Sequence, residues 1–287
     1  MRFESPDTIE QAIDLLNTCD GTSCVLAGGT DVLVQLRLAM AEPELIVDIK
    51  KIAGMRDITA ENGGFRIGAA VSGAEMGENT DLVAMWPGVV EAMELIGSTQ
   101  VQGRATMVGN LCNASPAADS VPAMVVAGAI VSISGPDGTR ECAVGDIPVG
   151  PGKTSLKQGE IITSVYLPAR PDNSGDAYLR FIPRTEMDIA VSSAGVNLTL
   201  DSEGVVTAAM VSLGAVAPTV LVVDDAAKAI IGTKLDEDAQ AALQAACSAA
   251  CSPIDDKRGT VEFRTKTAGV LAKRAAVIAY ARAGGSK

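Results

Sequence analysis

Two segments rich in glycine and small polar residues carry the groups best suited to chemistry. The first, Leu26–Leu33, has the sequence LAGGTDVL. Its apolar start, its glycine pair Gly28–Gly29 and the helical spacing that follows predict a strand, a tight turn and a helix. Glycines permit positive φ and let a ligand approach main-chain N–H groups, and a helix that begins there adds N–H groups and a positive dipole end. The segment indicates an anion site, most simply for phosphate or pyrophosphate; the alternative is an ordinary turn capped by Thr30 or Asp31.

The second segment, Ala105–Pro122, has the sequence ATMVGNLCNASPAADSVP. It is expected to be a long loop rich in small polar side chains, with a single acid, Asp119. Backbone amides and hydroxyl groups suit a pyrophosphate and a ribityl chain, and one carboxylate suits sugar hydroxyls. The segment therefore strengthens the prediction of a nucleotide-type ligand.

At these two segments the chain resembles the FAD-binding medium subunit of molybdenum hydroxylases, the flavoprotein of carbon monoxide, nicotinate and xanthine dehydrogenases. The family's first motif, AGGTD, is matched by Ala27–Asp31. Its second, TxGGNLxxASPxxDxxP, is matched by Thr106, Gly109–Leu111, Ala114–Pro116, Asp119 and Pro122. One position departs from the family, because Val108 stands where the first glycine of GGN is expected. A β-branched residue is strained at positive φ, so either φ is negative at Val108 or the loop takes another path.

The resemblance also implies which residues bind FAD. Leu156 lies in a segment similar to the family's TxLxxGEI, where the leucine packs on the flavin; the alternative is a buried leucine at a strand end. Arg180 maps to a basic residue near the isoalloxazine, where a cation would stabilise reduced flavin; the alternative is a surface arginine paired with Glu186 or Asp188. The implied cofactor-binding set is Ala27, Gly28, Gly29, Thr30, Asp31, Val32, Leu33, Thr106, Gly109, Asn110, Ser115, Asp119, Leu156 and Arg180.

Composition excludes several classes of function. The 287 residues carry a net charge of −12 and 3% aromatic residues, which opposes nucleic-acid binding. The chain has no histidine, so histidine-based catalysis, imidazole metal sites and flavin linked through histidine are excluded. Its six cysteines lack CxxC pairing and are expected to be core thiols. We predict no catalytic side chain, no metal site and FAD held without a covalent bond.

Two further patterns do not support other nucleotide sites. Gly150–Thr154 (GPGKT) resembles the end of a phosphate-binding P-loop, but Ile147 stands where the first glycine is required, and no helix follows. The dinucleotide-binding pattern GxGxxG is absent from the sequence. Without an apolar run of 18 residues or a secretory signal, we expect no membrane span and a cytoplasmic location.

The order of predicted elements indicates an α+β protein with a two-part FAD-binding region. Residues 1–51 alternate strands and helices, which predicts a small α/β subdomain with parallel pairing. Residues 52–170 predict a mixed α+β subdomain, in which Asn62–Gly64 forms a hairpin turn and Ser72 begins a capping box with Glu75. A Pro-, Asn- and Gly-containing linker at 168–175 precedes a C-terminal domain of antiparallel sheet and helices, residues 176–287.

The resemblance implies an FAD-carrying electron-transfer oxidoreductase subunit. Substrate oxidation would occur on a molybdopterin large subunit, and two [2Fe-2S] clusters on a small subunit would pass electrons to this flavin and on to a terminal acceptor. A dimer of heterotrimers, that is, a heterohexamer, is expected. The alternatives are a stand-alone FAD oxidoreductase similar to UDP-N-acetylenolpyruvoylglucosamine reductase, or a scaffold subunit that has lost its flavin, for which Val108 is the only sequence feature.

Overall fold

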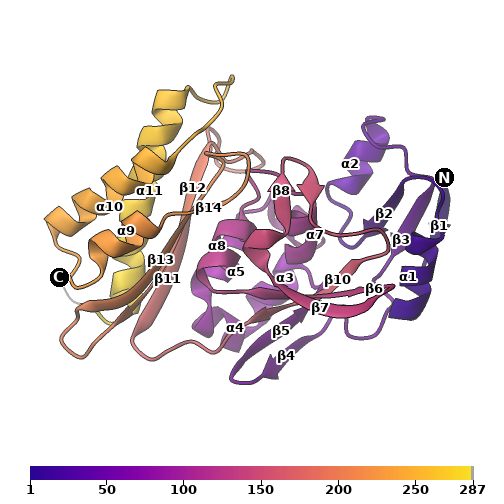
Figure 1. Cartoon of the computed structure of the whole chain (residues 1–287), viewed down its shortest axis with the longest axis horizontal. Coiled ribbons are helices and arrows are strands. Elements are labelled where there is room, and N and C mark those ends of the chain that lie inside the picture. Colours follow the sequence, from indigo (N-terminus) through magenta and orange to yellow (C-terminus); the bar gives the residue numbers. More distant parts are fainter. Residues whose placement is uncertain (286–287) are drawn as a thin grey trace.

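The computed structural model describes residues 1–285 of the chain as three consecutive units, each built on its own sheet (Figure 1). The first unit is a parallel three-stranded sheet of order β1-β3-β2, which confirms the pairing predicted from alternating strands and helices. The Thr8 hydroxyl caps the first helix of this unit by accepting the Gln11 N–H. The elements are β1 (Arg2–Glu4), α1 (Ile9–Asn17), β2 (Ser23–Leu26), α2 (Val32–Arg37) and β3 (Leu45–Asp48).

The second unit is an antiparallel sheet of order β4-β5-β10-β6-β7, packed against short helices. Asn62 and Gly63, both at positive φ, form the predicted hairpin turn. Ser72 and Glu75 form the predicted capping box. The strands are β4 (Ile58–Glu61), β5 (Gly64–Gly68), β6 (Ile130–Gly135), β7 (Gly138–Ala143), the short pair β8 (Pro148–Gly150) and β9 (Lys153–Thr154), and β10 (Ile161–Leu167).

The helices of the second unit include one that the sequence analysis missed. Met107–Cys112, inside the expected long loop, forms α7, because the Thr106 hydroxyl caps it by accepting the Gly109 N–H at 2.9 Å. Val108 is a buried residue of this helix and has no positive φ, so its β-branched side chain is unstrained. The other helices are α3 (Gly73–Glu78), α4 (Thr80–Met85), α5 (Pro87–Glu94), α6 (Thr99–Gln102), the 3₁₀ turn η1 (Val144–Asp146) and α8 (Ser120–Val126).

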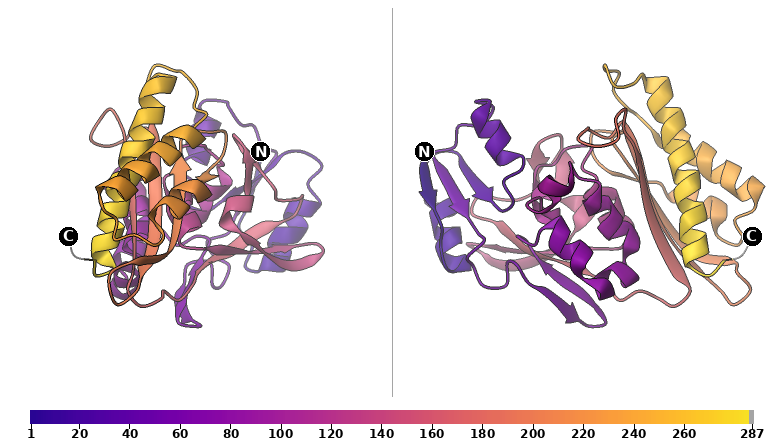
Figure 2. Two further views of the ribbon diagram at one scale, coloured as in Figure 1. Left: turned by 60° about the vertical axis from the view of Figure 1, so that its left-hand side comes forward. Right: turned by 180° about the vertical axis from the view of Figure 1, so that it is seen from behind.

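The third unit is an antiparallel sheet of order β11-β12-β13-β14 that lies between two layers of helices. Helices α9–α11 cover its outer face, and α5 and α8 of the second unit pack on the other face (Figures 1 and 2). The edge strand β14 was not anticipated from the sequence. The elements are β11 (Ser174–Phe181), β12 (Ser192–Leu200), β13 (Val206–Gly214), β14 (Leu221–Val222), α9 (Asp224–Ile230), α10 (Glu237–Ala250) and α11 (Val261–Arg282).

The three units, each with its own sheet, contain two apolar cores. One apolar core runs through the first two units, so that Ala12 and Leu16 of α1 share it with Phe65 and Ile133 of the second sheet. The third unit has a core of its own, built largely from alanine, valine and leucine. The first two units are therefore held to each other by buried apolar contact, which is non-directional and grows with the area removed from water.

The second and third units meet over a strip of small residues. Helix α8 approaches β12 and β13 so closely that a Cβ added to Gly195 would lie 2.9 Å from the carbonyl oxygen of Pro122. The Ser212 hydroxyl donates to that same oxygen at 2.8 Å. Glycine and serine are required here because a larger side chain would separate α8 from the sheet.

We expect Gly195→Ala to lower the free energy of unfolding by about 1–3 kcal/mol, because the added methyl group overpacks the contact with Pro122. The measurement is urea unfolding at constant pH. Gly150→Ala is the matched control, since Gly150 also lies in a strand but has no atom within 4 Å of its added Cβ. Equal stability of the two variants would show that α8 does not constrain β12.

Candidate functional site

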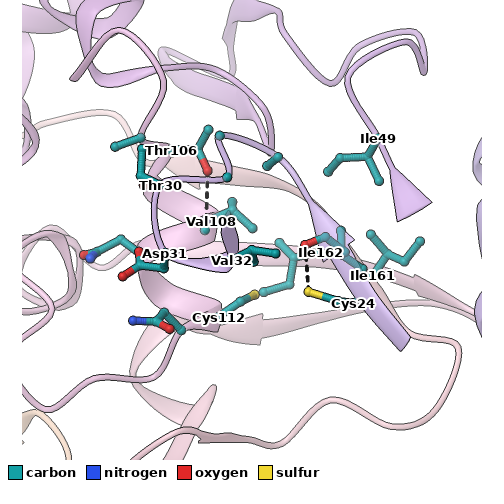
Figure 3. Close-up of a pocket in the computed structure, with 18 of the residues that line it drawn as sticks. Cys24, Thr30, Asp31, Val32, Ile49, Thr106, Val108, Cys112, Ile161 and Ile162 are labelled. Atoms are coloured by element: carbon teal, nitrogen blue, oxygen red, sulfur yellow. Dashed lines mark hydrogen bonds between the residues drawn. The ribbon is translucent and has the colours of Figure 1, made fainter. Parts of the chain in front are cut away.

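A cavity of about 350 Å³ lies where the first unit meets the second (Figure 3). Its volume falls at the low end of the range of about 300–1,000 Å³ that is usual for small-molecule sites. The end of β2 and the segment that follows it form one wall, α7 forms another, and β10 closes a third. The lining residues are Ser23, Cys24, Val25, Ala27–Val32, Gln35, Ile49, Ile96, Ala105, Thr106, Val108–Asn110, Cys112, Asn113, Thr154, Leu156 and Glu160–Ile162.

The two glycines of the first segment are required for different reasons. Gly29 has φ +79°, a conformation that favours glycine. Gly28 has ordinary φ, but a Cβ added to it would lie only 1.9 Å from the carbonyl oxygen of Arg104. The backbone of the first segment thus packs directly on the backbone that leads into α7.

The segment from Gly28 to Val32, hereafter the donor loop, presents five consecutive backbone N–H groups without a hydrogen-bond acceptor among the residues that the structure describes. All five residues line the cavity. Buried or half-buried N–H groups are nearly always paired with protein, water or a ligand, so this row of donors suits an anion. The alternative of a capped turn is wrong, because Asp31 makes no capping bond at the start of α2 and the Thr30 hydroxyl makes no hydrogen bond.

The side chains of the wall add negative charge and no positive charge. Asp31 and Glu160 line the cavity, whereas no lysine or arginine is among the lining residues. Hydrogen bonds from Arg140, at 2.8 Å to each carboxylate oxygen, lower the pKa of Glu160 to about 2. Desolvation raises the pKa of Asp31, whose carboxylate accepts no hydrogen bond within the described part of the chain. An anionic ligand must therefore be held by backbone donors.

The structure brings most of the predicted cofactor-binding residues together. Ten of the fourteen line the cavity: Ala27, Gly28, Gly29, Thr30, Asp31, Val32, Thr106, Gly109, Asn110 and Leu156. Leu33 points to solvent, with 55% of its surface exposed. Ser115, Asp119 and Arg180 also lie outside this cavity. The binding roles of all fourteen residues stay predictions.

Asp119 and Arg180 form a buried pair between the second and third units. The Asp119 carboxylate accepts a hydrogen bond from the Tyr178 hydroxyl at 2.7 Å and another from the Arg180 guanidinium. Desolvation raises the pKa of both Asp119 and Tyr178. The alternative given for Arg180 is wrong, because it is not a surface residue paired with Glu186 or Asp188. The Asp119 side chain makes no capping bond to α8.

Several lining residues had no signal in the sequence. Val25, Ile161 and Ile162 are apolar strand residues of a kind found throughout the core, and only their position in the fold makes them walls of a cavity. Gln35 and Asn113 are joined by a hydrogen bond of 3.1 Å, which links α2 to the end of α7. Neither residue belongs to a motif with a recognised mechanism.

A second cavity, of about 320 Å³, lies between the second and third units. Ser115–Ala117, which follow α7, line it together with Ile189–Ala190 and Arg258. The segment from Ala105 to Ala117 therefore contributes to both cavities, one on each side of Ala114.

Two further features of residues 1–285 bear on function. None of their helices has the length and apolar character needed to cross a membrane. Within the same range, no group of three or more Cys, Asp or Glu side chains is arranged to hold a metal ion.

Comparison with known proteins finds relatives that are similar over nearly the whole chain. Residues 1–170 match the family described as the FAD binding domain in molybdopterin dehydrogenase, and residues 177–278 match the CO dehydrogenase flavoprotein C-terminal domain. The chain is 33% identical to the carbon monoxide dehydrogenase medium chain of Afipia carboxidovorans, covering 98% of this chain and 97% of that one. It is 31% identical to a putative xanthine dehydrogenase FAD-binding subunit of Escherichia coli, covering 97% and 95%. A solved structure of reconstituted CO dehydrogenase from Oligotropha carboxidovorans superposes with a TM-score of 0.94 at 32% identity, covering 98% of each chain.

Asp31→Asn should raise the free energy of unfolding of the cofactor-free protein at pH 7, because the Asp31 carboxylate is partly desolvated and accepts no hydrogen bond within residues 1–285. The folded-state pKa is raised, so the cost of ionised Asp31 is present above that pKa and disappears as pH falls below the ordinary value of 3.8. The gain in the variant should therefore shrink as urea unfolding is repeated from pH 7 towards about pH 4. Asp172→Asn, in an exposed turn, is the control. A variant less stable than wild type at pH 7 would contradict this account.

Proposed function

The chain belongs to the family of FAD-binding subunits of molybdopterin dehydrogenases, and we propose that it holds FAD without a covalent bond in the cavity between its first two units. It is the FAD-carrying subunit of an oxidoreductase complex of the molybdenum hydroxylase type, in which partner subunits carry the [2Fe-2S] clusters and molybdopterin. The observation that carries the placement of the cofactor is the row of unpaired N–H groups in the donor loop.

The residues present fit a dinucleotide. The N–H groups of Gly28–Val32 would hold the pyrophosphate, and Thr106–Asn110 contribute to the same cavity. Leu156 and the strand residues Ile161 and Ile162 supply an apolar wall against which a flat ring can pack. The second cavity lies on the other side of Ala114 and is lined by Ser115. Asp119 and Arg180 lie between these elements and the third unit.

Bound FAD supplies the redox chemistry, relaying electrons from the iron–sulfur clusters to a terminal acceptor. The role of the chain is to bind and orient the cofactor. The residues that line the cavity include no histidine, no lysine and no cysteine that is ionised near neutral pH. Desolvation raises the pKa of the Cys112 thiol in the cavity wall to about 12, so it stays protonated. Glu160 is held ionised by Arg140 and does not exchange protons near neutral pH. Proton-coupled oxidation of an organic substrate therefore belongs to another subunit.

The complex follows from the relatives in its broad outline, since they are medium chains of multi-subunit enzymes with large and small partner subunits. A dimer of heterotrimers is part of our proposal, as is a cytoplasmic location. The latter is supported by six free cysteines, which are typical of a reducing compartment. The flavin-free scaffold loses its only support, because Val108 occupies an ordinary helical position.

Gly29→Ala tests the placement of the cofactor. We expect it to raise the FAD dissociation constant at least tenfold, which corresponds to about 1.4 kcal/mol. Alanine disfavours the φ of +79° found at Gly29, so the backbone of the donor loop should rotate and turn its N–H groups away from the cavity. Gly54→Ala is a closely matched control, since Gly54 has φ +81° and lies outside the cavity. Both variants should lose similar stability, and only the first should lose FAD, as measured by flavin fluorescence on titration. Undiminished FAD affinity in Gly29→Ala would remove the donor loop from the site.

Dependence on the partner subunits is tested by stopped-flow reduction of the flavin. The isolated FAD-loaded chain should stay oxidised on mixing with carbon monoxide, xanthine or nicotinate, the compounds named for its relatives. It should be reduced rapidly on mixing with a separately reduced iron–sulfur subunit. Rapid reduction by any of the three compounds alone would favour the stand-alone oxidoreductase.

A further inference from the structure

We infer that Lys50 is a positioning residue for FAD: its ammonium group fixes the peptide from which the donor loop begins. The inference rests on the proposed function and adds to it a residue that belongs to neither glycine-bearing segment. Lys50 lies two residues beyond the end of β3 and does not line the cavity.

The contacts place Lys50 where regular pairing between β2 and β3 stops. The register ends at Leu26 opposite Asp48, and the last backbone bond runs from Ile49 N–H to the Leu26 carbonyl at 3.1 Å. The next carbonyl along the chain, that of Ala27, accepts a hydrogen bond from Lys50 Nζ at 3.1 Å. Within residues 1–285 no other group donates to this carbonyl. The side chain thus replaces the backbone bond that a longer strand would have made.

Lys50 is itself held in place. Asp48 Oδ1 accepts from Lys50 Nζ at 2.7 Å and from the Lys50 backbone N–H at 3.1 Å. The side chains of Lys50 and Asp48 are 29% and 15% exposed, so the ion pair is largely shielded from water. A bond to a charged donor in such a setting is stronger than one between neutral groups.

The direction of the Ala27 carbonyl decides the direction of the first donor in the cavity. In a trans peptide the C=O and N–H groups lie in one plane and point to opposite sides, and the described chain has no cis peptide bond. Holding the Ala27 carbonyl towards Lys50 therefore turns the Gly28 N–H away from Lys50. That N–H is the first of the five unpaired donors.

Lys50 acts through geometry and not through net charge. The cavity wall has two acids, Asp31 and Glu160, and no lysine or arginine. Lys50 contacts the peptide next to the donor loop through the Ala27 carbonyl, and its own charge is balanced by Asp48. Its contribution to pyrophosphate binding is therefore the orientation of the Gly28 N–H, made without a lysine in the space that the ligand occupies.

The test compares Lys50→Met with Lys50→Arg, and with Lys51→Met as the control on an exposed neighbour. Dissociation constants for FAD come from flavin fluorescence, and those for ADP from competition with FAD. We expect Lys50→Met to weaken FAD and ADP alike by about tenfold, because both contain the pyrophosphate, and Lys50→Arg to recover most of the loss. The thermal midpoint of cofactor-free Lys50→Arg should stay close to that of wild type, whereas Lys50→Met, which leaves Asp48 without its ammonium partner, should lower it modestly.

The possible results separate the inference from its premise. Failure of the wild-type chain to bind FAD would defeat the proposed function itself. Wild-type binding with unchanged affinities in Lys50→Met would overturn only the role of Lys50. The role of Lys50 would also be overturned if Lys50→Met lowered the affinity for FAD and left the affinity for ADP unchanged. The same holds if Lys50→Arg did not restore the affinity and both variants had a lowered thermal midpoint.

Discussion

The structure of the site depends on one contact between two stretches of backbone. Gly28 lies against the carbonyl of Arg104 so closely that any side chain at this position would push the two apart. This contact sets the donor loop opposite Thr106 and α7, and so gives the cavity its two main walls. It can persist because the first two units share one apolar core, which holds the two stretches at a fixed separation.

A second constraint ties the walls of the cavity to the third unit. Helix α8, which follows the segment around α7, packs on β12 and β13 through glycine and serine. The buried pair of Asp119 and Arg180, together with the Tyr178 hydroxyl, crosses the same boundary. Removing one partner of a buried pair leaves an uncompensated charge, which is strongly destabilising. The third unit therefore contributes to the site indirectly, by holding the segment that lines both cavities.

The chemistry of the cavity suits a subunit that carries a cofactor and leaves substrate oxidation to a partner. Backbone N–H groups bind an anion at any pH at which the protein is folded, whereas side-chain cations and proton donors titrate or add charge. In the cavity wall, the Glu160 carboxylate is kept ionised by Arg140 and the Cys112 thiol is kept protonated by burial. Neither group takes up or releases a proton near neutral pH. Such a wall suits the proposed role of the cavity, in which the chain orients FAD and electrons for its reduction arrive from another subunit.

The sequence alone determined the division into three successive parts, the parallel pairing of the first sheet, the α+β fold class and ten residues of the cavity wall. These depend on local properties, namely hydrophobic periodicity and the requirement for glycine, which are written in neighbouring residues. Only the tertiary structure decided that Asp119 pairs with Arg180, 61 residues away, that Ile161 lines the cavity and that Lys50 contacts the Ala27 carbonyl. Those relations depend on which distant side chains are buried against each other, and burial is a property of the packed chain as a whole. Even helix α7 depends partly on tertiary packing, because burial of Val108 and Leu111 in the core stabilises it.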